Sequence, residues 1–206
     1  GVMLQRTLTH RQEQQVFWDW DNPTRFHSKS LSAVSEIIRS RASNLPNHSD
    51  DSTKRITILV RGKGPDFYHA EKTEVYGSGS ELRSIPNLSD LAIALESFGT
   101  VKFIDAATLS PAAQVQEFMH TDILIAQHGA GLSNILWMPS GATVIEIQPP
   151  LAPTIDHIFS NLAAALKLKY SVLYQEHEHS SIEVDAVSDL VRGVVLNQSS
   201  SIPLST

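Results

Sequence analysis

The sequence predicts an α/β fold with a parallel sheet and helices on both faces, and three observations support this prediction. Five short apolar segments rich in β-branched residues alternate with segments of helical periodicity from residue 55 onward. These short segments are apolar along most of their length, which is typical of strands buried on both faces. A chain of 206 residues is long enough for one such domain and a short extension. We therefore expect a Rossmann-like sheet with right-handed crossovers.

Residues 1–54 are expected to form an N-terminal extension or inter-domain segment with one helix. The first 27 residues mix polar and aromatic side chains without a sustained period. A helix is predicted over 28–43, where serines precede a run of apolar residues at helical spacing. These apolar residues are Leu31, Val34, Ile37 and Ile38.

Residues 55–198 are expected to form the Rossmann-like domain, followed by a tail over 199–206. The apolar runs predict strands over 55–60, 101–104, 122–126, 143–147 and 170–174. The apolar residues at helical spacing predict helices over 87–98, 111–119, 132–138, 154–168 and 183–196. Ser110 and Pro111 mark the start of one of these helices, because serine is a preferred N-cap and proline suits the first helical position.

Composition excludes several classes of site. The chain has no cysteine, which rules out disulfides, Cys-ligated zinc, iron–sulfur clusters and cysteine nucleophiles. The net charge of −6 argues against a nucleic acid partner, and residues 71–206 hold only 6 Lys/Arg against 15 Asp/Glu. An anion bound in that part must be held by a few placed groups. No apolar run approaches the roughly 18 residues needed to span a membrane.

The strongest functional signal lies between residues 123 and 147. A predicted buried strand is followed directly by His128, Gly129, Ala130 and Gly131, and then by a short helix. Glycines at such a turn let the backbone approach a ligand, and a helix N-terminus offers free N–H groups to an anion. The turn is interpreted either as a phosphate or diphosphate site, or as a tight turn whose glycines serve packing only.

Two enzyme classes share parts of this pattern. A dinucleotide-binding turn has a third glycine, but Asn134 stands at that position and Pro139 ends the helix early. Glu146 lies about where a ribose-binding acid would be, so a dinucleotide-dependent oxidoreductase stays open as a weaker alternative. A serine hydrolase is excluded, because no G-x-S-x-G elbow follows the turn.

The segment HGAGLSNILWMPSGATVIEI resembles the signature of glycosyltransferase family 61, in which threonine is commoner than Ser133. Arg61 after the strand ITILV, and Arg83 in the segment RSIPN, resemble the family's upstream motifs. The resemblance is best over residues 55–150. It implies the C-terminal, nucleotide-sugar-binding half of a GT-B enzyme, with the acceptor-binding domain missing upstream.

The resemblance implies an inverting transferase that moves a sugar from a UDP-sugar to a hydroxyl of a glycan or glycoprotein, without a cofactor. His128 and Glu146 are the expected catalytic residues; for Glu146 a buried acid paired with His128 or a loop amide is the alternative. The expected nucleotide-sugar and phosphate contacts are Arg61, Lys63, Arg83, Gly129, Ala130, Gly131, Leu132, Ser133 and Asn134. Arg61 follows a strand and can clamp a diphosphate with its fork, unless it pairs with Asp66 instead.

One alternative function stays open, and two possible metal-binding patterns are set aside. A non-catalytic nucleotide-sugar-binding module is an alternative to the enzyme. No metal site is expected, although Asp19-Trp20-Asp21 and the segment 176–179 (EHEH) contain residue types that ligate metals. The family resemblance implies the lumen of the endoplasmic reticulum or Golgi for a eukaryotic source and the cytoplasm for a bacterial one.

Overall fold

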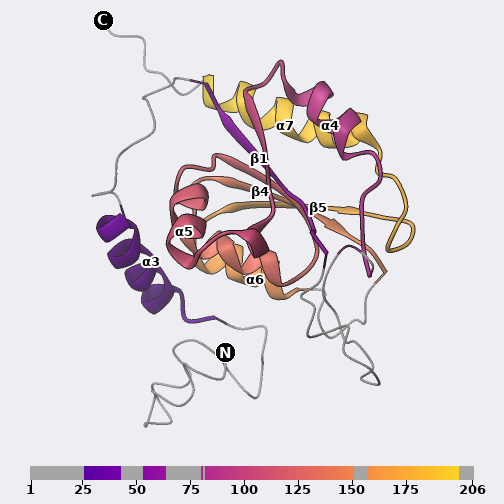
Figure 1. The fold of residues 1–206 in the computed structure, drawn as a ribbon. Coiled ribbons are helices and arrows are strands. Elements are labelled where there is room, and N and C mark those ends of the chain that lie inside the picture. The colour runs from indigo at the N-terminus through magenta and orange to yellow at the C-terminus, as the bar shows by residue number, and fades with distance from the viewer. Residues whose placement is uncertain (1–25, 43–52, 64–79, 81, 151–156, 200–206) are drawn as a thin grey trace, which may run out of the picture.

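The computed structural model describes residues 26–42, 53–63, 80, 82–150 and 157–199 of the chain. Its centre is a five-stranded, entirely parallel sheet in the order β2-β1-β3-β4-β5 (Figure 1). The strands are β1 (Arg55–Leu59), β2 (Thr100–Ile104), β3 (Ile123–Gln127), β4 (Thr143–Gln148) and β5 (Lys169–Tyr174). The predicted α/β class is therefore confirmed, and every predicted strand is present.

The helices also follow the predicted order. They are α3 (Ser28–Ala42), α4 (Leu88–Leu95), α5 (Pro111–Met119), α6 (Ile158–Ala165) and α7 (Val184–Ser199), with 3₁₀ helices η2 (Ala106–Thr108) and η3 (Ala130–Trp137). The Oγ of Ser110 accepts a hydrogen bond from the Ala113 N–H at 3.3 Å, which confirms the predicted cap of α5. The predicted helix after the glycine turn is a 3₁₀ helix that starts two residues earlier, because the Leu132 N–H bonds three residues back to the Gly129 carbonyl.

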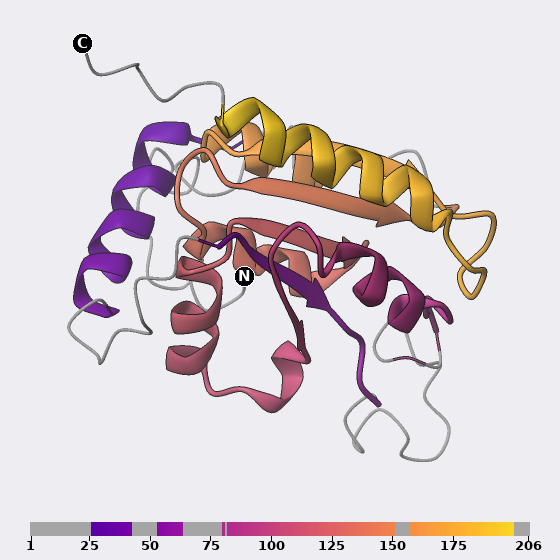
Figure 2. The ribbon, with the colours of Figure 1, turned by 90° about the horizontal axis from the view of Figure 1, so that it is seen from above.

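Helices cover both faces of the sheet (Figure 2). Helices α4 and α7 contact each other on one face, where Ile123 and Ile125 of β3 are fully buried. Helices α3, α5, α6 and η3 pack on the other face, where Leu124 and Ala126 point. Successive side chains of a strand point to opposite faces, so β3 is apolar on both sides as its sequence predicted.

Helix α3 packs against the sheet domain through polar as well as apolar contacts. Leu31 and Ser35 are buried, and the Ser35 hydroxyl donates to the Leu136 carbonyl at 2.5 Å. The Arg39 guanidinium donates to the Met138 carbonyl at 3.2 Å. These carbonyls lie at the C-terminal end of η3, where the helix has no further N–H groups to offer. Helix α3 therefore holds η3 in place.

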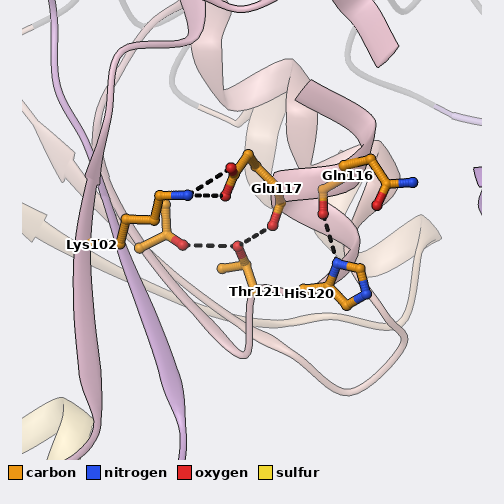
Figure 3. Close-up of polar contacts among 6 residues, drawn as sticks. Lys102, Gln116, Glu117, His120 and Thr121 are labelled. Atoms are coloured by element: carbon orange, nitrogen blue, oxygen red, sulfur yellow. Dashed lines mark hydrogen bonds and ion pairs between the residues drawn. The ribbon is translucent and has the colours of Figure 1, made fainter. Parts of the chain in front are cut away.

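Helix α5 is tied to β1 and β2 near its C-terminal end (Figure 3). Lys102 of β2 donates to both carboxylate oxygens of Glu117 at 2.6 Å. The Thr121 hydroxyl donates to the Glu117 carbonyl at 3.0 Å and shares a 2.8 Å hydrogen bond with the Thr57 hydroxyl of β1. The opposite, N-terminal end of α5 follows η2 and so lies at the carboxyl edge of the sheet.

Among the described residues, no helix is both long and apolar enough to cross a membrane.

The strand order creates a switch point between β1 and β3. The chain leaves β1 toward β2 on one side, and it leaves β3 toward β4 on the other. In open parallel sheets, loops that diverge in this way leave a crevice beyond the carboxyl ends of the two strands, and ligands bind there. Arg61 follows β1 and His128 follows β3, so both predicted site residues lie at this switch point.

Candidate functional site

Two arginines converge on one backbone carbonyl at the switch point. The Arg61 Nη2 donates to the His128 carbonyl oxygen at 2.6 Å, and the Arg83 Nη1 donates to the same oxygen at 2.9 Å. Arg61 comes from the loop after β1, whereas Arg83 comes from the segment that precedes α4. The sequence predicted both as phosphate contacts, and the structure brings them together.

The arginine pair, Arg61 and Arg83, carries positive charge without a neutralising acid in the described part of the chain. Neither guanidinium forms an ion pair with a carboxylate there. Burial, and then the nearby charge of Arg83, lower the pKa of Arg61 to about 10, so it stays protonated at neutral pH. Its Nε is buried and has no hydrogen-bond partner among the residues that the structure describes. Two guanidinium groups that have no carboxylate partner among the described residues favour an anion at this place. Asp66, the alternative partner of Arg61, lies outside the described residues.

The two glycines of the turn have different roles. Gly129 has a φ of 154°, and a Cβ on it would lie 1.7 Å from the Arg61 Nη2. Only glycine therefore lets Arg61 reach the turn. A Cβ on Gly131 would instead meet the Leu59 Cδ2 at 2.8 Å, in the core. The surroundings of Gly131 are those of a packing position, and the surroundings of Gly129 are those of a close contact with the Arg61 side chain. That a phosphate lies against this turn stays a prediction.

We expect Gly129→Ala to destabilise the fold by about 1–3 kcal/mol, because alanine is strained at this φ and its methyl group overlaps Arg61. Gly131→Ala is expected to cost less, since the end of the Leu59 side chain can rotate away. Urea denaturation of both variants measures the difference. Equal losses would show that the Arg61 contact does not constrain residue 129.

His128 and Glu146 form a buried pair next to the arginines. Glu146 faces Ala126 in the register of β3 and β4, so it shares a face with His128, two residues further along. The His128 Nδ1 is hydrogen-bonded to the Glu146 Oε1, and the ring packs edge-to-face on Phe159 with centroids 5.1 Å apart. A carboxylate at Nδ1 holds the ring in one orientation and leaves Nε2 as the nitrogen for other contacts.

The burial of Glu146 decides between its two predicted roles. Its exposed fraction is 0%, and that of His128 is 6%. Direct contact between this carboxylate and a ribose or sugar hydroxyl would require exposure that it lacks. The structure shows the alternative, a buried acid paired with His128. A dinucleotide-dependent oxidoreductase therefore loses the acid that its ribose would need.

The remaining residues of the turn divide between surface and core. Ala130 and Ser133 are exposed, whereas Leu132 and Asn134 are buried. The Leu132 N–H donates to the Gly129 carbonyl within η3, and its side chain belongs to the core. Its role as a nucleotide-sugar contact stays a prediction. Lys63 is exposed two residues beyond Arg61, and its role stays a prediction.

The sequence analysis missed a buried amide network that holds the Arg83 segment. Gln127, at the end of β3, donates to the Gln175 Oε1 at 2.6 Å. Gln175, directly after β5, donates to the Ser84 carbonyl at 2.9 Å. The Ser84 N–H donates in turn to the Glu178 carbonyl at 2.8 Å. An amide side chain that ends an apolar strand is the signal that would have found this network.

The candidate metal patterns do not form a site in the described residues. The segment 176–179 forms a turn against the amide network, and His179 is hydrogen-bonded to the Ser84 hydroxyl at 3.0 Å. Within the described ranges, no group of three or more His, Cys, Asp or Glu side chains is arranged to hold a metal ion. Asp19 and Asp21 lie outside those ranges.

Comparison with known proteins identifies related sequences. Residues 17–145, more than half of the chain, match the family described as Glycosyltransferase 61. The chain is 34% identical over 109 residues to the EGF domain-specific O-linked N-acetylglucosamine transferase of Xenopus laevis, covering 50% of this chain and 18% of that protein. It is 27% identical over 108 residues to the beta-1,2-xylosyltransferase XAX1 of Oryza sativa subsp. japonica, covering 52% of this chain and 19% of that protein. The chain thus spans less than a fifth of either relative.

Proposed function

Because the chain belongs to glycosyltransferase family 61, we propose that it binds the nucleotide-sugar donor of a glycosyl transfer reaction. The donor is a UDP-sugar, and the acceptor is a hydroxyl group of a glycan or glycoprotein. The observation that supports this function is the arginine pair, which shares the His128 carbonyl at the switch point and has no carboxylate partner among the described residues. A diphosphate supplies the missing negative charge.

The names of the relatives support a transferase but leave the sugar open. One relative is named as an N-acetylglucosamine transferase and the other as a xylosyltransferase. The two names share the transfer of a sugar and differ in which sugar is transferred. We therefore carry over glycosyl transfer to this chain, as the donor-binding half of a GT-B enzyme, and no particular sugar.

The proposed reaction is a displacement with inversion at the anomeric carbon. The acceptor oxygen forms a bond to this carbon on the face opposite the diphosphate, while the bond from the carbon to the phosphate oxygen breaks. The electron pair of that bond stays on the leaving UDP, where the guanidinium groups of Arg61 and Arg83 stabilise the developing charge. The acceptor proton passes to a general base that we expect on the acceptor side of the cleft.

His128 and Glu146 act together in this proposal. Glu146 is a positioning residue, since it is buried and reaches the site only through the His128 ring. The second ring nitrogen of His128 contacts the diphosphate or the donor sugar. Because the Glu146 carboxylate engages the Nδ1–H, Nε2 donates a hydrogen bond to this group in the doubly protonated ring. Ala130 and Ser133 lie on the exposed side of the same turn, where the Ser133 hydroxyl is a further donor.

We expect UDP to bind in the absence of a divalent cation, because the arginines supply the positive charge that a metal ion supplies elsewhere. Titration calorimetry with EDTA and with manganese should give affinities within about twofold of each other, a difference of roughly 0.4 kcal/mol. NAD, titrated alongside, should not bind. A strict manganese requirement would overturn this assignment and make Asp19 and Asp21 candidate ligands.

A further inference from the structure

Arg83 lies in a segment without helix or strand, residues 82–87, and two amide side chains hold this segment. The Ser84 carbonyl accepts a hydrogen bond from the Gln175 Nε2 at 2.9 Å and a second one from the Gln127 Nε2 at 3.3 Å. Both glutamine side chains are buried. Hydrogen bonds from buried amides are costly to break, because each amide would be left without a partner and out of reach of water. The backbone next to Arg83 is therefore held in one place.

The sheet in turn fixes the two glutamines. Gln127 is the last residue of β3 and lies opposite Ile147 of β4. The Gln175 N–H donates to the Gln148 carbonyl at 2.9 Å, which extends the pairing of β4 and β5 by one residue. The Gln127 Nε2 also donates to the Gln175 Oε1 at 2.6 Å, so each side chain orients the other. The segment around Arg83 thus takes its position from the sheet.

The amide network and the arginine contact form a closed ring of hydrogen bonds. The Arg83 Nη1 donates to the His128 carbonyl at 2.9 Å. His128 directly follows Gln127, and Arg83 directly precedes Ser84. The donor and the acceptor of the arginine contact are therefore each one residue away from a member of the network. Such a ring restricts where the guanidinium can lie.

A second contact holds the other end of the segment. The Asn87 Nδ2 donates to the Ile182 carbonyl at 2.9 Å, and the Ile182 N–H donates to the Asn87 Oδ1 at 3.0 Å. Asn87 precedes α4 and makes no side-chain hydrogen bond that caps this helix. Ile182 and Gln175 both belong to the loop between β5 and α7. This loop therefore holds the segment at two points.

We propose that Gln175 is a positioning residue, which acts through the Ser84 carbonyl to hold the Arg83 guanidinium beside Arg61. The inference rests on the proposed function, and it adds the loop after β5 to the parts of the chain that determine donor affinity. Two guanidinium groups that share one carbonyl repel each other, so their arrangement needs support from elsewhere. With this support both groups are in place before the diphosphate arrives, and binding does not have to order them.

The test is a double-mutant cycle with UDP as the probe. Gln175→Met keeps a similar side-chain volume and removes the amide. Calorimetry on the full chain compares the wild type, Gln175→Met, Arg83→Ala and the double variant. Arg83→Ala should lower the affinity about tenfold or more. Gln175→Met should lower it at least about threefold in the wild type and less than about 1.5-fold in Arg83→Ala, because the group that it positions is then absent.

Two further variants complete the test. Gln116 of α5 (Figure 3) donates to the Ala42 carbonyl at 2.5 Å, so Gln116→Met removes a comparable hydrogen bond between other elements and should leave UDP affinity unchanged. Asn87→Ala loosens the same segment at its other end. It should show the same dependence on Arg83 as Gln175→Met, and it decides the question if Gln175→Met does not fold.

The outcomes separate this inference from the proposed function. A residue that only stabilises the fold would give equal losses in the two backgrounds, and this result would overturn the inference while UDP binding stands. Unchanged affinity in Arg83→Ala would also overturn it, because Gln175 would then have no ligand contact to position. If the wild type does not bind UDP, the proposed function fails, and the inference fails with it.

Discussion

Arg61→Ala is expected to lower the affinity for UDP by about 10- to 150-fold, which corresponds to the roughly 1.5–3 kcal/mol of a hydrogen bond to a charged group. The loss should affect ligand binding and leave the stability of the fold nearly unchanged. Arg61 is bonded to the His128 carbonyl, and Arg83 donates to the same oxygen, so the carbonyl keeps a donor in the variant. Titration calorimetry and thermal unfolding of the same sample separate the two effects.

Two controls sharpen this prediction. Arg61→Lys keeps the charge but lacks the fork that binds two phosphate oxygens, so its affinity should lie between those of wild type and Arg61→Ala. Arg192→Ala removes an exposed arginine of α7 that pairs with Asp189, and UDP affinity should not change. An unchanged affinity in Arg61→Ala would remove Arg61 from the binding site.

Glu146→Ala is expected to destabilise the fold by about 3–5 kcal/mol, the cost of removing one partner of a buried polar pair. Glu146 is fully buried, so the substitution leaves a cavity and deprives the His128 Nδ1 of its partner in a site that water does not reach. The free energy of unfolding in urea measures the loss.

Conservative and remote substitutions serve as controls for this loss. Glu146→Gln keeps the side-chain volume and an oxygen that can accept from Nδ1, so it should lose less stability than Glu146→Ala. Glu176→Ala, at an exposed position after β5, should stay within about 0.5 kcal/mol of the wild type. A loss below about 1 kcal/mol in Glu146→Ala would contradict the role of the buried pair in the fold.

The residue types along the chain determined the elements of this fold, because their signals are local. The alternation of short apolar runs with helical periodicity predicted the five strands and the helices between them. Serine followed by proline predicted the start of α5, which the structure confirms. Strand periodicity, helix periodicity and helix caps depend on residues that are close in sequence. They can therefore be recognised without knowledge of the fold.

The composition of the glycine turn also pointed to the candidate site. His128, Gly129 and Arg61 follow apolar strands, and the carboxyl ends of parallel strands share one edge of a sheet. The prediction that these residues lie together is therefore a consequence of strand direction. The sequence did not distinguish the roles of Gly129 and Gly131. The atoms beside Gly129 belong to Arg61 in the loop after β1, whereas those beside Gly131 belong to Leu59 in the core.

Tertiary structure alone decided the strand order, the burial of Glu146 and the amide network next to Arg83. Glu146 pairs with His128 because β4 lies next to β3 in a particular register. Gln175 holds the Ser84 carbonyl although 91 positions separate them in the chain. Each of these features depends on contacts between distant segments, and the pattern of residues within one segment does not specify its neighbour.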